Sequence, residues 1–103
     1  MTSKTTVSVI QMCCVEEPRK NLDTAERLVR KAAESGAQII LLPELFERFY
    51  FCQQRRYDFY DFAKPAAENE AVRRFSSVAK ELGTVIPVSF FERDGNCLYN
   101  SAA

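Results

Sequence analysis

The feature that most constrains the fold is the stretch Gln38–Glu47, which reads QIILLPELFE. Its unbroken apolar run, Ile39–Leu42, favours a strand buried on both faces, because a strand with one wet face alternates apolar and polar residues. Pro43 cannot donate a hydrogen bond to a sheet ladder, so we expect the strand to end there. Glu44 would then lie just past the carboxyl end of a buried strand, at the edge where open α/β sheets bind ligands.

Two interpretations of Glu44 are open at this point. A carboxylate that is partly withdrawn from water at such an edge is suited to act as a general base. The alternative is a solvent-exposed acid that ends a strand, which is the commoner situation for charged residues in loops. The rest of the chain bears on this choice.

The segment before this strand predicts a βαβ unit. Thr6–Met12 is rich in β-branched residues and predicts a first strand. Apolar residues recur at helical spacing between Pro18 and Gly36, and both residues are typical of helix boundaries. Strands joined through one helix are parallel neighbours, so the segments Gln11–Cys14 and Pro43–Glu44 should share one edge of the sheet.

The second half of the chain predicts another helix and a hairpin. Asn69 can cap a helix whose apolar residues again have helical spacing. Thr84–Glu92 predicts a third strand, in which Pro87 favours an edge position or a bulge. Asp94–Asn96 is a tight-turn signal, and Cys97–Ala103 would be the antiparallel partner strand.

Length and composition indicate a single soluble globular unit. The chain has 103 residues, of which 47% are hydrophobic and 27% are charged. We expect a short disordered tail at residues 1–5 and an α/β domain over residues 6–103. The predicted order is β-α-β-α-β-β, and two helices are few to cover such a sheet. We therefore interpret residues 6–103 as the opening portion of a larger domain that is incomplete at its C-terminus.

The charge pattern argues against several classes of partner. Lys plus Arg equals Asp plus Glu at 14 each, so no net field favours nucleic acid or an anionic membrane. The chain has neither the roughly twenty consecutive apolar residues of a membrane helix nor the apolar core of a secretory signal. We expect a cytoplasmic protein that binds neither nucleic acid nor membrane.

The histidine and cysteine content narrows the possible chemistry. There is no histidine, and the four cysteines, Cys13, Cys14, Cys52 and Cys97, form no C-x-x-C pair. A metal site is therefore not expected. Any nucleophile would need a carboxylate or a lysine as its base, because mechanisms that use histidine are excluded. We interpret Cys13, Cys14 and Cys97 as small buried apolar residues with free thiols.

An aromatic segment, residues 46–62, holds eight of the chain's twelve aromatic residues, with arginines between them. No regular period fits it, so we predict a long loop that forms the wall of a pocket or a subunit contact. Stacking on single-stranded nucleic acid is an alternative for this composition. It is disfavoured because Glu47, Asp58 and Asp61 offset the arginines.

Several motifs resemble, in sequence order, the opening of the nitrilase superfamily of carbon–nitrogen hydrolases. They are VSVIQM, NLDTA with AAESGA, IILLPELF, KELGTVIPVSFFER and NCLYNSA. The resemblance covers residues 6–103, about the first third of a complete family domain. The stretch LPELFERFYFCQQRRYDFYDFAKP is most similar to plant-type N-carbamoylputrescine amidases. The resemblance implies a four-layer α-β-β-α sandwich, of which this chain would be the β-α-β-α-β-β part, with apolar strand faces left exposed.

The resemblance also implies a Glu-Lys-Cys catalytic set without a cofactor. Glu44 matches the glutamate of that set through the LPEL motif, as the general base. The motifs of the lysine and the cysteine lie beyond residue 103, and neither Lys64 nor any cysteine of this chain lies in a matching motif. This chain alone would therefore be inactive.

The implied substrate is a small-molecule amide or carbamoyl amine, acted on by a homo-oligomeric parent protein. For N-carbamoylputrescine the products would be putrescine, ammonia and carbon dioxide, in polyamine biosynthesis. A cationic substrate end favours an acidic or aromatic lining, for which Glu47 and Tyr50 are candidates. The alternative hypothesis is a catalytically inactive truncated form that acts as an interaction or oligomerisation module.

Overall fold

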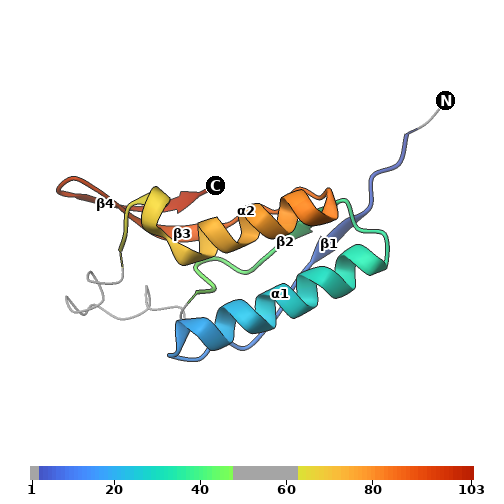
Figure 1. Ribbon diagram of the computed structural model, residues 1–103, viewed down its shortest axis with the longest axis horizontal. Helices are drawn as coiled ribbons and strands as arrows, with labels where there is room; N and C mark the ends of the chain where they lie inside the picture. The colour runs from blue at the N-terminus through green and yellow to red at the C-terminus, as the bar shows by residue number, and fades with distance from the viewer. Residues whose placement is uncertain (1–2, 48–62) are drawn as a thin grey trace.

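Two helices cover one face of a short parallel sheet, and a β-hairpin continues beyond it (Figure 1). The computed structural model describes residues 3–47 and 63–103. The elements are β1 (Val7–Val9), α1 (Pro18–Glu34), β2 (Ile39–Leu41), the 3₁₀ turn η3 (Ala66–Glu68), α2 (Glu70–Leu82), β3 (Ser89–Asp94) and β4 (Cys97–Ala102). The predicted α/β class and the order β-α-β-α-β-β are confirmed.

The helix boundaries follow the sequence signals. Pro18 begins α1, where its missing N–H leaves no backbone hydrogen bond unmade. The side chain of Asn69 caps α2 by accepting a hydrogen bond from the Val72 N–H at 2.9 Å. Gly83 ends α2 with a φ of 65°, a conformation that glycine adopts without a steric penalty. Neither helix in the described part of the chain has the length and apolar character that crossing a membrane requires.

The predicted βαβ unit is confirmed. β1 and β2 pair in parallel, and the Ile10 N–H extends the ladder by donating to the Leu41 carbonyl at 2.8 Å. The chain after α2 adds a third parallel segment at one point, where Val85 bridges Ile39 and accepts a hydrogen bond of 2.9 Å from the Ile40 N–H. The carboxyl ends of β1 and β2 therefore lie at the same edge.

The predicted strand Thr84–Glu92 consists of two pieces that pair with different partners. Val85 pairs with β2, whereas β3 forms a separate antiparallel sheet with β4. Val88 and Ala103 extend this second ladder through two backbone hydrogen bonds of 2.9 and 2.8 Å. Pro87 lies between the pieces and cannot donate to either ladder. The sequence predicted one strand with an edge position or a bulge at Pro87; instead, Pro87 lies where the chain leaves one sheet for the other.

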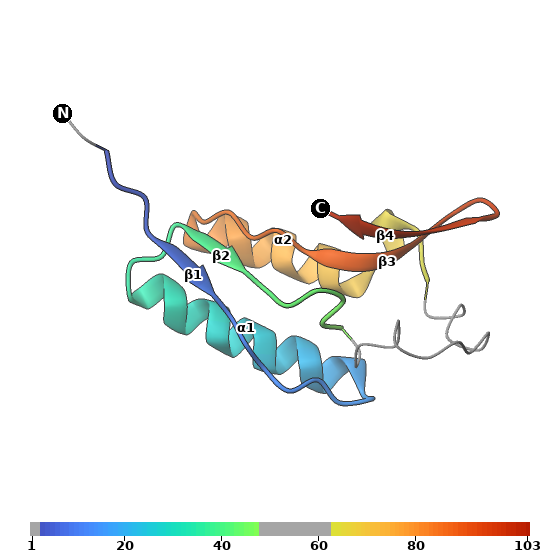
Figure 2. The same ribbon diagram turned by 180° about the vertical axis from the view of Figure 1, so that it is seen from behind.

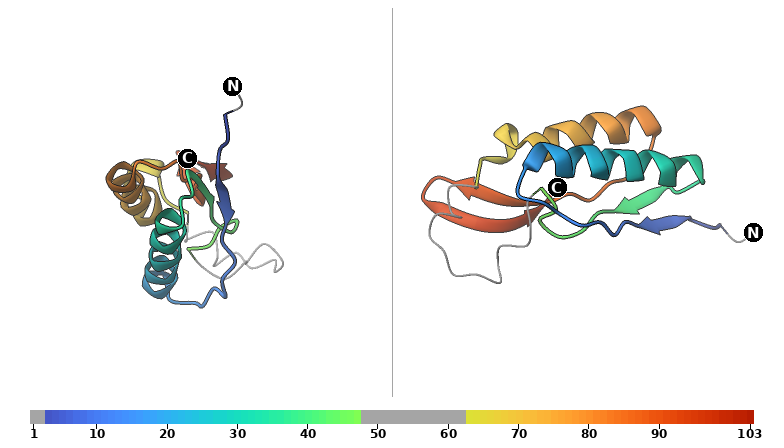
Figure 3. Two further views of the ribbon diagram at one scale, coloured as in Figure 1. Left: turned by 90° about the vertical axis from the view of Figure 1, so that its right-hand side faces the viewer. Right: turned by 90° about the horizontal axis from the view of Figure 1, so that it is seen from below.

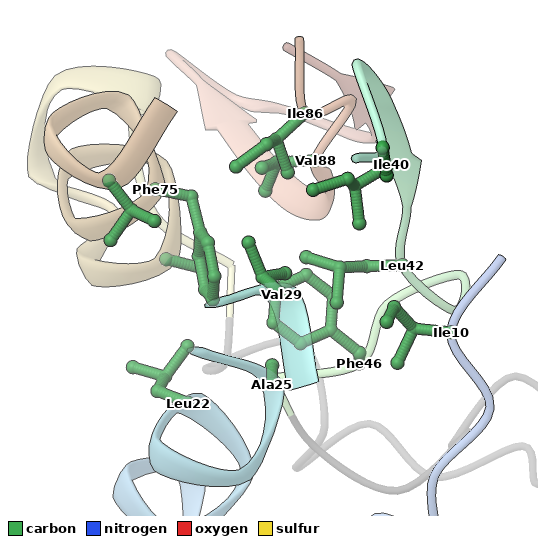
Figure 4. Packing of buried hydrophobic residues seen from close by; sticks show 13 residues of the cluster. Ile10, Leu22, Ala25, Val29, Ile40, Leu42, Phe46, Phe75, Ile86 and Val88 are labelled. Atoms are coloured by element: carbon green, nitrogen blue, oxygen red, sulfur yellow. The ribbon is translucent and has the colours of Figure 1, made fainter. Parts of the chain in front are cut away.

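The core lies between the helices and the sheet (Figure 4). Its members are buried apolar residues from the helices, the sheet and the turn after β2: Ile10, Leu22, Ala25, Val29, Ala37, Ile40, Leu42, Phe46, Ala71, Phe75, Val78, Ile86 and Val88. The rings of Phe46 and Phe75 meet edge to face, with centroids 5.5 Å apart and an interplanar angle of 82°. This contact ties the turn after β2 to α2.

The prediction that β2 is buried on both faces is wrong for the described residues. Ile40 and Leu42 point into the core, but Leu41 is 44% exposed. The sheet faces the helices on one side only, as seen from behind and end-on (Figure 2, Figure 3). The other side, which we call the open face, consists of exposed apolar residues: Val7, Val9, Leu41 and Val85.

Two of the cysteines also differ from the prediction. Cys13 and Cys97 are exposed and Cys14 is half-buried, so the expected burial is wrong for the first two. Cys97 lies at the start of β4, whose outer edge has no partner strand among the described residues. Cys52 lies outside the described residues.

An ion-pair network joins the outer surfaces of α1 and α2. Arg74 donates to Glu26 at 2.8 Å and to Asp23 at 2.6 Å. Arg30 donates to the second oxygen of Glu26 at 3.1 Å and to Glu81 at 2.6 Å. The hydrogen bonds from Arg74 and then from Arg30 hold the pKa of Glu26 below its ordinary value. Glu26 is therefore the acid at the centre of the network.

Replacement of Glu26 should make the free energy of unfolding less dependent on pH. Because the folded state lowers the pKa of Glu26, its stabilisation is complete above the unfolded value of 4.5 and is lost as the pH falls through the folded value. We expect Glu26→Gln to lower the free energy of unfolding by about 1 kcal/mol at neutral pH and by less in acid. Urea unfolding at several pH values measures this, with Glu34→Gln on the same helix as the control. An unchanged pH dependence in Glu26→Gln would contradict it.

Candidate active site

Glu44 begins a tight turn, Glu44–Glu47, which Leu42 and Pro43 separate from the end of β2. The strand ends before Pro43, as the sequence predicted. The turn lies at the carboxyl edge shared with β1, because the Cys14 thiol, beyond the end of β1, donates to the Phe46 carbonyl at 3.3 Å. The predicted meeting of these two segments is confirmed.

Leu45 gives this turn its shape. Its φ of 50° is the only positive φ of a non-glycine residue in the described ranges. The left-handed conformation costs an L-residue about 1–2 kcal/mol. Burial offsets this cost, because Leu45 is 3% exposed and Phe46 is fully buried. The chain thus places two apolar side chains inward and leaves the carboxylate of Glu44 outside.

The carboxylate of Glu44 belongs to a ring of hydrogen bonds between three elements. The Asn100 Nδ2 in β4 donates to Glu44 Oε1 at 2.6 Å. The Ser89 hydroxyl in β3 donates to Asn100 Oδ1 at 3.4 Å and accepts from the Leu45 N–H at 3.1 Å. Glu44 is exposed among the described residues, so the expected withdrawal from water is not found there.

Two buried asparagines hold the other end of the turn. Asn21 is 1% exposed, and its Nδ2 donates to the carbonyls of Glu47 and Val15 at 2.9 and 2.7 Å, while its Oδ1 accepts from the Val15 N–H at 2.8 Å. Asn69, also 1% exposed, donates from its Nδ2 to Glu47 Oε2 at 3.3 Å. Both helices therefore contact Glu47 through polar groups shielded from water.

The structure separates the predicted site residues. Glu44 and Glu47 occupy opposite ends of the turn, and their carboxylates have different partners, Asn100 and Asn69. Tyr50 lies outside the described residues. Lys64 is exposed, and its backbone pairs with β3.

Cys14 is close to the turn but is poorly suited to act as a nucleophile. Burial, and to a smaller degree the neighbouring Cys13, raises the pKa of the Cys14 thiol. Because the thiolate is the reactive form, a raised pKa lowers reactivity at neutral pH. For Cys14, this favours the interpretation that the thiol is not the nucleophile.

Three residues of the site were missed from the sequence: Asn21, Ser89 and Asn100. Asn21 adjoins the apolar stripe of α1, and a polar residue at such a position signals a buried hydrogen bond. Ser89 interrupts an otherwise apolar run, VIPVSFF, in a similar way. Asn100 carries no comparable signal, because its contact depends on the register of the hairpin.

The fold agrees with comparisons to known proteins. Residues 6–103 match the family model of the carbon-nitrogen hydrolases, and the chain belongs to this family. It is 52% identical over 101 residues to the N-carbamoylputrescine amidase of Oryza sativa subsp. japonica, covering 98% of this chain and 34% of that protein. It is 50% identical over 97 residues to the N-carbamoylputrescine amidase of Arabidopsis thaliana, covering 94% of this chain and 32% of that protein.

A more distant relative and a solved structure extend the match. The citrullinase of Francisella tularensis subsp. tularensis is 40% identical over 97 residues, covering 94% of this chain and 34% of that protein. The crystal structure of a carbon-nitrogen hydrolase from Helicobacter pylori G27 superposes with a TM-score of 0.84 at 26% identity, covering 95% of this chain and 34% of that one. The resemblance seen in the sequence is confirmed. The chain spans about a third of the length of the curated relatives it matches.

Loss of the Asn21 side chain should destabilise the fold. Asn21→Leu keeps the branching of the side chain but leaves three backbone groups of Val15 and Glu47 without their partner. We expect the free energy of unfolding to fall by about 2–4 kcal/mol, as measured by urea denaturation. Arg27→Ala, on the exposed side of the same helix, is the control and should change it by less than about 0.5 kcal/mol. Equal stabilities of the two variants would contradict this role of Asn21.

Proposed function

We propose that Glu44 is the general base of a carbon–nitrogen hydrolase whose complete chain converts N-carbamoylputrescine to putrescine, ammonia and carbon dioxide. The observation that carries the proposal is the position of Glu44. Its carboxylate lies just after β2, at the carboxyl edge of the parallel sheet, in a chain of the carbon-nitrogen hydrolase family. Ligands bind at this edge in open α/β sheets.

The geometry of the carboxylate fits proton transfer. Asn100 binds Oε1, and Oε2 makes no hydrogen bond within residues 3–47 and 63–103. A general base must come within hydrogen-bond distance of the proton that it removes. A carboxylate whose Oε1 is held by Asn100, and whose Oε2 has no partner among the described residues, can present Oε2 to such a proton.

The reaction needs partners that this chain does not contain. Following the family resemblance, we place a cysteine nucleophile and a lysine beyond residue 103. Glu44 would take the proton of the thiol, and the sulfur would bond to the carbon of the scissile carbonyl. The lysine would stabilise the oxyanion. Glu44 would then give the proton to the leaving nitrogen as the carbon–nitrogen bond breaks.

The second half of the reaction restores the enzyme. Glu44 would take a proton from water, whose oxygen attacks the carbonyl carbon of the thioester. The bond between carbon and sulfur then breaks, and the sulfur takes the proton back. One carboxylate can serve both halves because it is regenerated in its ionised form after each of them.

The proposed substrate follows from the names of the relatives. N-carbamoylputrescine amidases and a citrullinase are among them. N-carbamoylputrescine and citrulline, the compounds in these names, both carry a ureido group at the end of an alkyl chain. We propose the first as the substrate because the plant amidases are 50–52% identical to this chain and the citrullinase 40%. Glu47 and Tyr50 stay predicted contacts of the cationic end. The homo-oligomeric state, the cytoplasmic location and the tail at residues 1–5 also stay predictions.

Glu44→Gln tests the general base directly in the complete protein. Glutamine keeps the shape of the side chain and an oxygen that accepts from Asn100, but it cannot take a proton. We expect kcat for N-carbamoylputrescine to fall by about 10²–10⁴-fold, with an unchanged melting temperature. Glu34→Gln, an exposed acid on α1, is the control. Normal turnover in Glu44→Gln would overturn the proposal.

A second candidate function is the interaction module, and the open face is the observation that favours it. Val7, Val9 and Val85 are 57%, 66% and 60% exposed. A contiguous apolar sheet face of this kind is typical of surfaces that bind another protein surface. A catalytically inactive form of the protein could therefore associate with the complete enzyme.

The chain of residues 1–103 should self-associate without turning over N-carbamoylputrescine. Sedimentation velocity and co-purification with the complete protein measure association. The double variant Val9→Lys with Val85→Lys should remain monomeric, because it places charges on the open face. The matched control, Arg27→Lys with Arg73→Lys, changes exposed helix positions and should associate as the parent chain does. A monomeric parent chain at the same concentration would dismiss this candidate.

A further inference from the structure

We propose that Asn100 is a positioning residue that fixes the carboxylate of Glu44 for proton transfer, and that Ser89 orients Asn100. The inference rests on the proposed function, because it concerns how the proposed base is held. It adds two residues from the hairpin to a site otherwise built on the turn after β2.

The contact between Asn100 and Glu44 is short and directional. The Nδ2–Oε1 distance is 2.6 Å, slightly shorter than the roughly 2.7–2.9 Å typical of an N–H hydrogen bond to a charged acceptor. An ionised carboxylate only accepts hydrogen bonds, so the nitrogen of the Asn100 amide must face Glu44. The amide oxygen then faces Ser89, at 3.4 Å from its hydroxyl. The partners on both sides thus agree on one orientation of the amide.

Ser89 links the side chain of Glu44 to its backbone. Its hydroxyl oxygen accepts from the Leu45 N–H at 3.1 Å while its proton is donated to Asn100. Leu45 is the residue with the positive φ that sets the direction of the turn. Ser89 therefore restrains the peptide next to Glu44 and, through Asn100, the far end of the Glu44 side chain. Two points of restraint leave the carboxylate little freedom to rotate.

The register of the hairpin brings these residues together. Phe91 lies opposite Asn100 in the ladder, so Ser89, two residues before Phe91, is a diagonal neighbour of Asn100 on the same face. A slip of one residue would move Asn100 to the other face. A two-residue loop fixes the register, and its first residue, Gly95, has a φ of 61°, as tight hairpins require.

The experiment is a double-mutant cycle in the complete protein, with N-carbamoylputrescine as the substrate. We expect Asn100→Ala to lower kcat by about 10–100-fold, with KM changed less than twofold and the melting temperature unchanged. Asn100→Asp has the same shape but places a second carboxylate beside Glu44, and it should lower kcat at least as much. If the Asn100→Ala variant fails to fold, Asn100→Asp tests the same contact in its place. Asn96→Ala, in the exposed hairpin loop, is the control and should have normal kcat.

The combination with Glu44→Gln separates positioning from a general structural role. If Asn100 acts through Glu44, adding Asn100→Ala to Glu44→Gln should lower the residual kcat no further. Ser89→Ala should likewise add nothing to Asn100→Ala. An additive loss in the double variant, or normal kcat in both Asn100 variants while Glu44→Gln is impaired, would overturn the inference and leave the proposed function standing. Normal kcat in Glu44→Gln would overturn the proposed function, and this inference with it.

Discussion

The burial of Phe46 is the interaction on which the surroundings of Glu44 depend. Its ring is fully buried and lies edge to face with Phe75, the centroids 5.5 Å apart. Burying a phenylalanine contributes about 1.5–3 kcal/mol, enough to offset the left-handed conformation of Leu45, which costs about 1–2 kcal/mol. Because the core holds Phe46 so soon after the end of β2, the chain must reverse within the turn. That reversal leaves Glu44 at the edge of the sheet.

Local signals in the sequence were enough to predict the elements and the position of Glu44. The boundary residues Pro18 and Asn69 act on the backbone within a few positions, and α1 and α2 begin where these residues predict. The Asn100–Glu44 contact could not be predicted in this way, because it spans 56 positions and requires both the hairpin register and the turn at Leu45. The position of Asn21 beside the apolar stripe signals a buried hydrogen bond, but its partners are backbone groups of Val15 and Glu47, which no side chain in the sequence marks.

The wrong prediction for β2 has a physical origin. A continuous apolar run indicates that both faces of a strand avoid water, but it does not say which part of a protein covers each face. The helices cover one face, and the open face of Val7, Val9, Leu41 and Val85 is bare among the described residues. If the chain is part of a complete carbon–nitrogen hydrolase, we interpret the open face as the surface that the second sheet of a four-layer α-β-β-α sandwich would cover; in the interaction-module alternative, another protein chain would cover it. On the first interpretation, the run Ile39–Leu42 is apolar throughout because its open face packs against a second sheet in a longer chain.

The hydrogen bonds that hold the two ends of the Glu44–Glu47 turn differ in their exposure to water. At the Glu47 end, the side chains of Asn21 and Asn69 are almost fully buried, so their hydrogen bonds do not compete with water. At the Glu44 end, the Asn100 contact is exposed, and such a bond contributes less. A substrate that displaces water from this edge would strengthen the exposed bond, because the same charges then interact in a medium of lower dielectric constant. The turn is thus already fixed at the Glu47 end, whereas at the Glu44 end a substrate bound as proposed would add to the restraint that Asn100 places on the carboxylate.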